Sequence, residues 1–260
     1  MSVRDKHAGL RKNITQPVTE GMAKWRASGS SQYTQEAYDR VIQVMHDDMF
    51  TGREGDGRLR PSLIGSCPRQ QLFSWMGVEQ EPPSSISMQA MEAGTDWHYR
   101  WQLIGLSQGF LTDIEVKVVY EPWNMRGSVD GILSDGSGFE LKTVNSWKYK
   151  QVIANGALKT EFRHMLQVHA YMIALDIDMF SIVYQDRNSG QYQEIRVAKD
   201  PVWVDMLTNE MESLVSHIGK NTLPSMLDPC KEQVVTDYAY QYCPYKSVCP
   251  TISNLTDYSK

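Results

Sequence analysis

The sequence predicts an α/β domain with one mixed sheet flanked by helices, and three observations lead to that prediction. Segments with apolar residues at helical spacing are interspersed with shorter runs in which apolar and polar residues alternate, as in half-buried strands. Two of these runs are joined by the Gly- and Ser-rich residues 134–138, a linker typical of a β-hairpin loop. With 260 residues, 41% of them hydrophobic, the chain is long enough to bury one sizeable core.

The expected elements follow one another in a simple order. Residues 1–62 are expected to form an N-terminal helical arm, in which residues 32–49 have the clearest helical pattern. Residues 63–250 are expected to form the main domain and residues 251–260 a C-terminal tail. In the main domain we expect helices over residues 68–75, 87–108, 163–175 and 202–218, and strands over residues 111–120, 126–133, 139–143, 179–186 and 191–197.

The hairpin carries the charged residues that point to a function. If its loop is symmetric, Asp130 lies opposite Lys142 and Ile132 opposite Glu140, so that all four side chains share one face. The other face, expected in the core, carries Val129, Leu133, Phe139 and Leu141. Two neighbouring carboxylates repel each other unless one is protonated or a cation neutralises both. Mg²⁺ or Mn²⁺ would neutralise them and activate water for attack on a phosphodiester. The alternative is a surface hairpin with a solvated charged face.

The spacing Asp130-x9-Glu140-x-Lys142 resembles the core motif of the PD-(D/E)xK nuclease superfamily, although Val129 replaces the proline in that motif. Upstream, residues 94–98 resemble the Gly-x-x-x-His element of the RecB-like exonuclease branch of this superfamily. Downstream, residues 167–171 resemble its Gln-x-x-x-Tyr element. The resemblance implies a restriction-endonuclease-like core, in which a mixed central sheet is flanked by helices.

The resemblance also implies a role for each motif residue. The ligands of a catalytic Mg²⁺ or Mn²⁺ would be His98, Asp130, Glu140 and the backbone carbonyl of Leu141. Lys142 would orient the attacking water. Gln167 and Tyr171 are four residues apart, so they project from the same face of a helix and would position the DNA strand or hold Lys142.

Four cysteines form a second group: Cys67, Cys230, Cys243 and Cys249. Twelve residues separate Cys230 from Cys243, and the chain contains no CxxC pair of the kind found in zinc ribbons. Two disulfides would require an oxidising compartment, whereas residues 1–7 are polar and charged, unlike a secretory leader. The four thiols could instead bind zinc, or the four cysteines could be buried independently of one another.

In a subgroup of the RecB-like family, one cysteine before the nuclease core and three after it hold a four-iron, four-sulfur cluster. The order of the cysteines here resembles that subgroup, as found in CRISPR-associated exonucleases and the nuclease domains of bacterial AddB subunits. The resemblance implies an iron-sulfur clasp made by residues 63–76 and 228–250, which closes the C-terminal segment onto the N-terminal helices. Zinc bound by the same thiols is the alternative cofactor.

The resemblance implies a DNA exonuclease that hydrolyses phosphodiester bonds from DNA ends, on single strands. The expected setting is phage recombination or replication, or CRISPR-type DNA processing. The alternatives are a catalytically idle subunit that binds DNA ends and a structure-specific endonuclease on the same core. The expected partners are DNA and either a second copy of the chain or a CRISPR or recombination protein.

The charge distribution bears on DNA binding. A net charge of −5 argues against a broad nonspecific DNA coat. Candidate DNA contacts are the basic and aromatic residues that follow the hairpin: Trp147, Lys148, Tyr149, Lys150 and Arg163. The sequence has no apolar run long enough to span a membrane. We expect an intracellular, cytoplasmic protein, located in the host cytoplasm if a phage encodes it.

Overall fold

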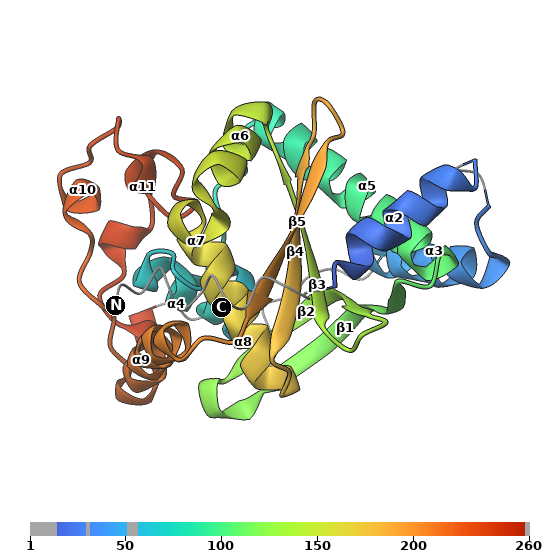
Figure 1. Cartoon of the computed structure of the whole chain (residues 1–260). Coiled ribbons are helices and arrows are strands. Elements are labelled where there is room, and N and C mark those ends of the chain that lie inside the picture. The colour runs from blue at the N-terminus through green and yellow to red at the C-terminus, as the bar shows by residue number, and fades with distance from the viewer. Residues whose placement is uncertain (1–14, 30–31, 51–56, 258–260) are drawn as a thin grey trace, which may run out of the picture.

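The computed structural model describes residues 15–29, 32–50 and 57–257 (Figure 1). At the centre lies a five-stranded sheet whose strands are side by side in chain order. The strands are β1 Leu111–Tyr120, β2 Met125–Leu133, β3 Gly138–Val144, β4 Met179–Asp186 and β5 Tyr192–Ala198. β3 and β4 pair parallel, and the other neighbours pair antiparallel. The expected α/β domain with a mixed sheet is therefore confirmed.

Helices cover both faces of the sheet (Figure 1). One side carries α2 Pro17–Ala27, α3 Gln35–Phe50 and α5 Ser85–Ser107. The other side carries α6 Ser146–Asn155, α7 Ala157–Thr160 and α8 Phe162–Leu175, with α9 Pro201–Lys220 packed against α8. Of the expected N-terminal arm, residues 1–14, 30–31 and 51–56 lie outside the described residues. Within the described ranges, none of the helices combines the length and the hydropathy that a bilayer crossing requires.

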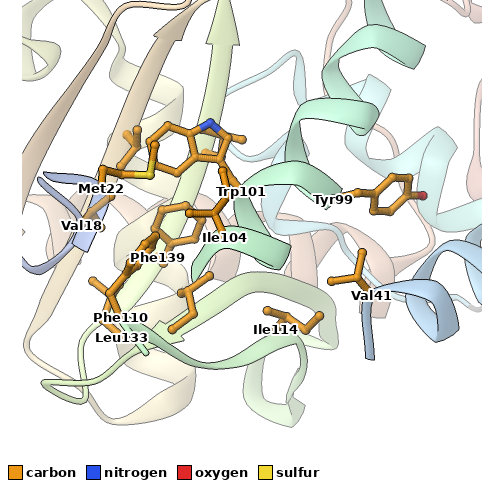
Figure 2. Packing of buried hydrophobic residues seen from close by; sticks show 13 residues of the cluster. Val18, Met22, Val41, Tyr99, Trp101, Ile104, Phe110, Ile114, Leu133 and Phe139 are labelled. Carbon is orange, nitrogen blue, oxygen red and sulfur yellow. The ribbon is translucent and has the colours of Figure 1, made fainter. Parts of the chain in front are cut away.

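The position of α5 is set by the core cluster in Figure 2. Trp101 packs against Phe139 of β3 with ring centroids 6.4 Å apart, and its indole N–H donates to Gln185 Oε1 of β4 at 2.6 Å. Val18 and Met22 of α2 and Ile104 of α5 belong to the same cluster. Close packing of this kind leaves little freedom for the helix to slide. It therefore holds the preceding turn of α5, which carries His98, in a fixed position.

The opposite face of the sheet is covered by α8. Residues with no exposed surface pack together there: Met165, Val168 and Met172 on the helix, Phe180 and Ile182 on β4. The polar side of α8 carries Gln167 and Tyr171, one turn apart. Gln167 contacts Lys142 of β3, and Tyr171 contacts the backbone of Ser128 in β2. The helix therefore brings its polar side chains to the hairpin.

The hairpin differs from the expected one in its register. Ile132 pairs with Gly138 rather than with Glu140. The expected register, which also placed Asp130 opposite Lys142, is therefore wrong.

The reason for the different register is a shorter loop. The amide of Leu133 donates to the carbonyl of Ser137 at 2.8 Å, and Gly136 has a left-handed φ of 83°. A three-residue loop with glycine in this conformation is a common hairpin connection. It lets the strands pair closer to the tip than the symmetric five-residue loop that the sequence predicts.

The four expected core residues of the hairpin are all buried, but they do not lie on one face. Leu133, Phe139 and Leu141 pack with α5, whereas Val129 packs with α8. The alternation of side chains is interrupted between Val129 and Leu133. At this level Glu115, in the neighbouring strand β1, has a left-handed φ of 47°. The prediction of one shared core face is wrong because of this irregularity.

The C-terminal segment folds back onto α4, Pro68–Met76. Tyr245 lies edge-on to Phe73 of α4 with ring centroids 5.4 Å apart, and the amide of Glu81 donates to the carbonyl of Pro244 at 2.7 Å. The short helices of this region are α10 Asp228–Lys231, α11 Tyr238–Gln241 and the 3₁₀ turns η4 Cys249–Thr251 and η5 Leu255–Asp257. Two further 3₁₀ turns, η2 Pro61–Leu63 and η3 Glu121–Trp123, lie earlier in the chain. The fold thus brings the C-terminal cysteines toward Cys67, which precedes α4.

Candidate active site

The candidate site lies where β2 and β3 separate. The last paired residues of the two strands are Gly131 and Phe139. Beyond them the amide of Leu141 donates to Asp130 Oδ2 at 2.7 Å, a hydrogen bond to a side chain in place of a ladder bond. Asp130 and Glu140 are buried, with 9% and 3% of their surface exposed. Two carboxylates are thus held in a poorly solvated position, which is unfavourable without positive charge nearby.

Lys142 supplies one positive charge. Its ammonium donates to Glu140 Oε1 at 2.7 Å and to Gln167 Oε1 at 2.9 Å. The amide nitrogen of Gln167 also donates to Glu140 Oε1, at 2.9 Å. The three side chains form a closed ring of hydrogen bonds across β3 and α8. An ammonium has three donors, so one N–H of Lys142 is left to contact water or a phosphate oxygen.

His98 supplies a second positive charge from α5. Its Nδ1 lies 3.4 Å from Asp130 Oδ2. Burial opposes protonation of the ring, but the charge of Asp130 and the contact with it outweigh burial and raise the pKa of His98 to about 8. Burial would likewise raise the pKa of Asp130, yet His98 and the Leu141 amide hold that pKa below its usual value. The pair is therefore an ion pair at neutral pH.

A third carboxylate, that of Glu115, joins the site and is missed by the sequence prediction. Side chains alternate along β1, and the pairing of Ile114 with Gly131 and of Val116 with Val129 sets Glu115 opposite Asp130. Glu115 has a left-handed φ of 47°. Its carboxylate accepts hydrogen bonds from Gln102 of α5 at 2.9 Å and from Ser128 of β2 at 2.7 Å. Non-glycine residues with such φ values are strained and are often found at functional sites.

The ligand atoms of this group lie close enough to hold one ion. Nitrogen or oxygen atoms of His98, Glu115 and Asp130 all lie within 4.8 Å of one another. Burial, followed by repulsion from Asp130, raises the pKa of Glu115, and the same two causes raise the pKa of Glu140 to about 7. The second oxygen of Glu140, Oε2, is buried without a hydrogen-bond partner. Carboxylates with raised pKa values and an unpaired oxygen fit a divalent cation, which would satisfy both.

Tyr171 has a different environment from Gln167. It is 3% exposed, stacks on Phe180, and its hydroxyl donates to the carbonyl of Ser128 at 2.6 Å. Burial, followed by the charge of Glu140, raises the pKa of Tyr171 well above its usual value, so it remains a neutral donor. Its contacts hold β2 against α8.

The expected DNA contacts differ in exposure. Trp147 is 67% exposed and Lys150 is exposed, both on α6. Tyr149 packs on the core under α8, and Lys148 pairs with the buried Glu161 at 2.8 Å. Arg163 is exposed, and its guanidinium donates to the carbonyl of Ser62 at 3.2 Å. Trp147 and Lys150 are therefore the two of the five that point freely to solvent.

A partly buried histidine lies one turn before Gln167. Its ring, that of His164, contacts the Tyr184 hydroxyl through Nδ1 at 3.0 Å. Burial lowers the pKa of His164, and the positive charges of Lys142, Arg163 and Lys148 lower it further, to about 3. The ring is therefore neutral at physiological pH.

The four cysteines line one cavity between α4 and the C-terminal segment. Arg69 lies 7% exposed beside it, and its guanidinium donates to Cys249 Sγ at 3.2 Å and to the carbonyls of Cys249 and Ile252 at 2.9 and 2.6 Å. Burial and then the neighbouring thiols raise the pKa of Cys230; burial also raises the pKa of Cys243. Burial therefore disfavours the thiolate form of Cys230 and Cys243 unless positive charge lies nearby.

The spacing of the thiols bears on which metal they could hold. Tetrahedral zinc sites place sulfur atoms about 3.8 Å apart, for a zinc–sulfur distance of about 2.3 Å. Among the described residues, no three of the thiols have sulfur atoms that all lie within 4.8 Å of one another. The space between them is about 20 Å³, room for about one water molecule. Zinc would draw the thiols inward, and a cubane would displace lining side chains outward.

Comparisons with known proteins identify the fold. No family model and no curated protein sequence matches the chain. The structure of LHK-Exo in complex with dAMP has a TM-score of 0.51 at 17% identity, covering 63% of this chain and 89% of that one. SSO0001 has a TM-score of 0.50 at 14% identity, covering 82% and 95%. A second structure of LHK-Exo, an alkaline exonuclease from Laribacter hongkongensis, has a TM-score of 0.47 at 15% identity, covering 63% and 89%. The chain thus shares its fold with an alkaline exonuclease.

We predict that Glu115→Gln weakens Mn²⁺ binding at least about ten-fold, because the substitution removes a charge and a ligand oxygen while keeping the size of the side chain. Isothermal titration of the metal-free protein with MnCl₂ measures the change. Glu212→Gln, on the exposed side of α9, is the matched control and should bind as the unsubstituted protein does. Equal affinity in both variants would remove Glu115 from the site.

We predict that His164 makes the fold sensitive to acid. An unfolded chain protonates this histidine below its ordinary pKa of 6.5, whereas the folded protein does so only near 3. The free energy of unfolding should therefore fall as the pH drops below 6.5, by at most about 1.4 kcal/mol per pH unit from this group. His164→Gln should reduce that loss between pH 7 and pH 5 in urea unfolding. The same loss in His164→Gln and in the surface control His46→Gln would contradict the assignment.

Proposed function

We propose that this protein is a metal-dependent deoxyribonuclease that hydrolyses phosphodiester bonds from DNA ends, with single-stranded DNA as its substrate. The observation that carries the proposal is the ring formed by Lys142, Glu140 and Gln167 beside the buried Asp130. In a solvent-exposed hairpin, water would hydrate both oxygens of a carboxylate. In Glu140 the oxygen Oε2 is instead buried without a hydrogen-bond partner. The shared fold with an alkaline exonuclease supports the proposal.

The cation would be held by His98, Glu115, Asp130 and Glu140, with the backbone carbonyl of Leu141 as a further oxygen ligand. These donors are a histidine nitrogen and hard oxygens, which suit Mn²⁺ or Mg²⁺. When bound, the cation supplies a Lewis acid that activates water and stabilises negative charge on the phosphoryl group. Burial and repulsion from Asp130 raise the pKa values of Glu115 and Glu140, and the charge of a cation would oppose both effects.

Lys142 would orient the attacking water or the scissile phosphate with the N–H that its two partners leave free. Gln167 would keep the ammonium aimed at the site, since its amide bonds to both Lys142 and Glu140. Tyr171 would act indirectly. Its hydrogen bond to Ser128 would hold β2, and therefore Asp130, in position. These roles divide the motif into groups that touch the substrate and groups that position them.

DNA as the substrate is supported by the surroundings of the site. LHK-Exo, which has the same fold, has been crystallised with the nucleotide dAMP. In this chain, the exposed Trp147 and Lys150 on α6 offer a stacking surface and a positive charge to a single strand. Arg163, Lys148 and Tyr149 are proposed as secondary contacts.

We further propose that the four cysteines bind a four-iron, four-sulfur cluster, with zinc as the alternative. Their thiols line one cavity, and the buried Arg69 beside them would compensate negative charge on sulfur. The cluster would close the C-terminal segment onto α4. The proposed setting is an intracellular one, in phage recombination or CRISPR-type DNA processing, with a second copy of the chain or a recombination protein as partner.

We predict that Lys142→Ala lowers DNA cleavage at least about 100-fold, because the ammonium that orients the water or the phosphate is lost. The fold should stay intact, because Glu140 can take up a proton when its partner is lost. The assay follows end-labelled linear and circular single-stranded DNA with Mn²⁺. The unsubstituted protein should release label from linear DNA and leave the circle whole.

The outcomes separate the alternatives. Lys220→Ala, an exposed lysine on α9, should cut as the unsubstituted protein does. Cutting of the circle would favour an endonuclease, and binding of ends without any cleavage would favour an idle subunit. Full activity of Lys142→Ala would remove the lysine from the mechanism.

We predict that protein purified without air is brown and contains about four irons per chain, and that Cys243→Ser abolishes both properties. Absorption spectra and metal analysis of iron and zinc measure this directly. Ser247→Ala, a neighbouring exposed position, should retain the metal. A colourless protein with one zinc per chain would replace the cluster by zinc and leave the nuclease proposal in place.

A further inference from the structure

A second polar cluster extends the active site along α8, one turn before Gln167. In the parallel pairing of β3 and β4, Lys142 lies beside Tyr184. The hydroxyl of Tyr184 lies 3.0 Å from His164 Nδ1. His164 Nδ1 is also 3.6 Å from one oxygen of Glu161, whose other oxygen pairs with Lys148 at 2.8 Å. The cluster therefore starts one strand away from the catalytic lysine and reaches α6.

The hydrogen bond to Tyr184 determines which nitrogen of His164 carries the hydrogen. Tyr184 has no exposed surface, so its hydroxyl hydrogen cannot be given to water. A buried donor without an acceptor is unfavourable, and the ring nitrogen of His164 lies within hydrogen-bonding distance. The neutral ring therefore accepts at Nδ1 and carries its own hydrogen on Nε2. The side chain of His164 is 25% exposed, which gives a ligand access to it.

Positive charges surround this N–H group. Lys142, Lys148 and Arg163 all act on the ring of His164, and each of them disfavours a further positive charge there. These charges favour an anion beside the ring, although Lys142 is also paired with Glu140 and Lys148 with Glu161. Glu161 is the negative group that faces the ring, and Lys148 neutralises that charge while being held in place beside His164. A neutral N–H donor with a lysine next to it is a suitable contact for a phosphate oxygen.

We propose that His164 and Lys148 form a binding site for the phosphate next to the scissile one in the DNA strand. This proposal rests on the nuclease function proposed above and adds to it the direction in which the strand leaves Lys142, toward α6. The phosphate could be an internal phosphodiester or the terminal phosphate at a DNA end. Both present the same oxygens to the site, and substrates with and without a terminal phosphate distinguish them.

The test maps the contact by chemical substitution of single phosphates. Fluorescence anisotropy in EDTA, where no cleavage occurs, measures the affinity for oligonucleotides in which one linkage at a time is an uncharged methylphosphonate. A parallel pair carries a 5′-phosphate or a 5′-hydroxyl. In the unsubstituted protein one substitution near the cleaved end should weaken binding about ten-fold or more. That loss should disappear in His164→Leu and in Lys148→Met, because the contact is already absent there.

Matched variants separate binding from folding. His164→Gln retains an N–H donor and should recover most of the affinity that His164→Leu loses. Lys148→Met should also reduce the salt dependence of binding by about 0.7 in the slope of log K against log salt, whereas the remote Lys220→Met should leave it unchanged. Urea unfolding checks that each variant is folded.

The outcomes distinguish failure of the phosphate site from failure of the proposed nuclease function. If the unsubstituted protein cuts DNA and His164→Leu shows the same pattern of sensitive linkages, the phosphate site is overturned and the nuclease remains. If the unsubstituted protein neither binds nor cuts DNA, the proposed function fails and this site fails with it. Sensitivity to the 5′-phosphate alone would assign the site to a DNA end, and sensitivity to one internal linkage would assign it to the continuing strand.

Discussion

The structure depends on how buried negative charge is balanced between β2 and β3. Asp130 and Glu140 are both almost fully buried, and two charged carboxylates in such a place repel each other strongly. His98 offsets the first through an ion pair, and Lys142 offsets the second through a hydrogen bond. The raised pKa values of Glu140 and Glu115 indicate that this compensation is incomplete. The remaining deficit of positive charge is what makes the site suitable for a divalent cation.

The rest of the fold holds these charges in place. α5 is anchored on one face through Trp101 and delivers His98, while α8 is anchored on the other face and delivers Gln167. The sheet itself contributes an irregularity, since Glu115, which lies opposite Asp130, has a left-handed backbone conformation. Strain of this kind persists only where the surrounding packing enforces it. Gln102 and Ser128, which bond to the Glu115 carboxylate, provide part of that enforcement.

The sequence predicts the periodic parts of this molecule well and the irregular parts poorly. The expected limits of β1 and β4 match the structure, because both are runs rich in apolar residues, whereas α6 and α7 lack a clear apolar pattern and were not expected. Asp130, Glu140 and Lys142 come together although their expected register is wrong. The register differs by two residues, and such a shift leaves each side chain on the same face of the sheet. Glu115 could not be found in this way, because the pairing of β1 with β2 that sets it opposite Asp130 was not predicted. Nor could the role of Arg69 be read from the sequence, because its partners beside the cysteines lie about 180 residues away.

We propose that a divalent cation binds between His98, Glu115 and Asp130, whose ligand atoms lie within 4.8 Å of one another, with Glu140 as a further ligand. The most direct measurement is an anomalous difference map from crystals of the full chain soaked in MnCl₂, with data collected near the manganese absorption edge. We predict one strong manganese peak within bonding distance of Asp130 and of the unpaired oxygen of Glu140. A map with no peak there, with Lys142 still bonded to Glu140, would contradict it.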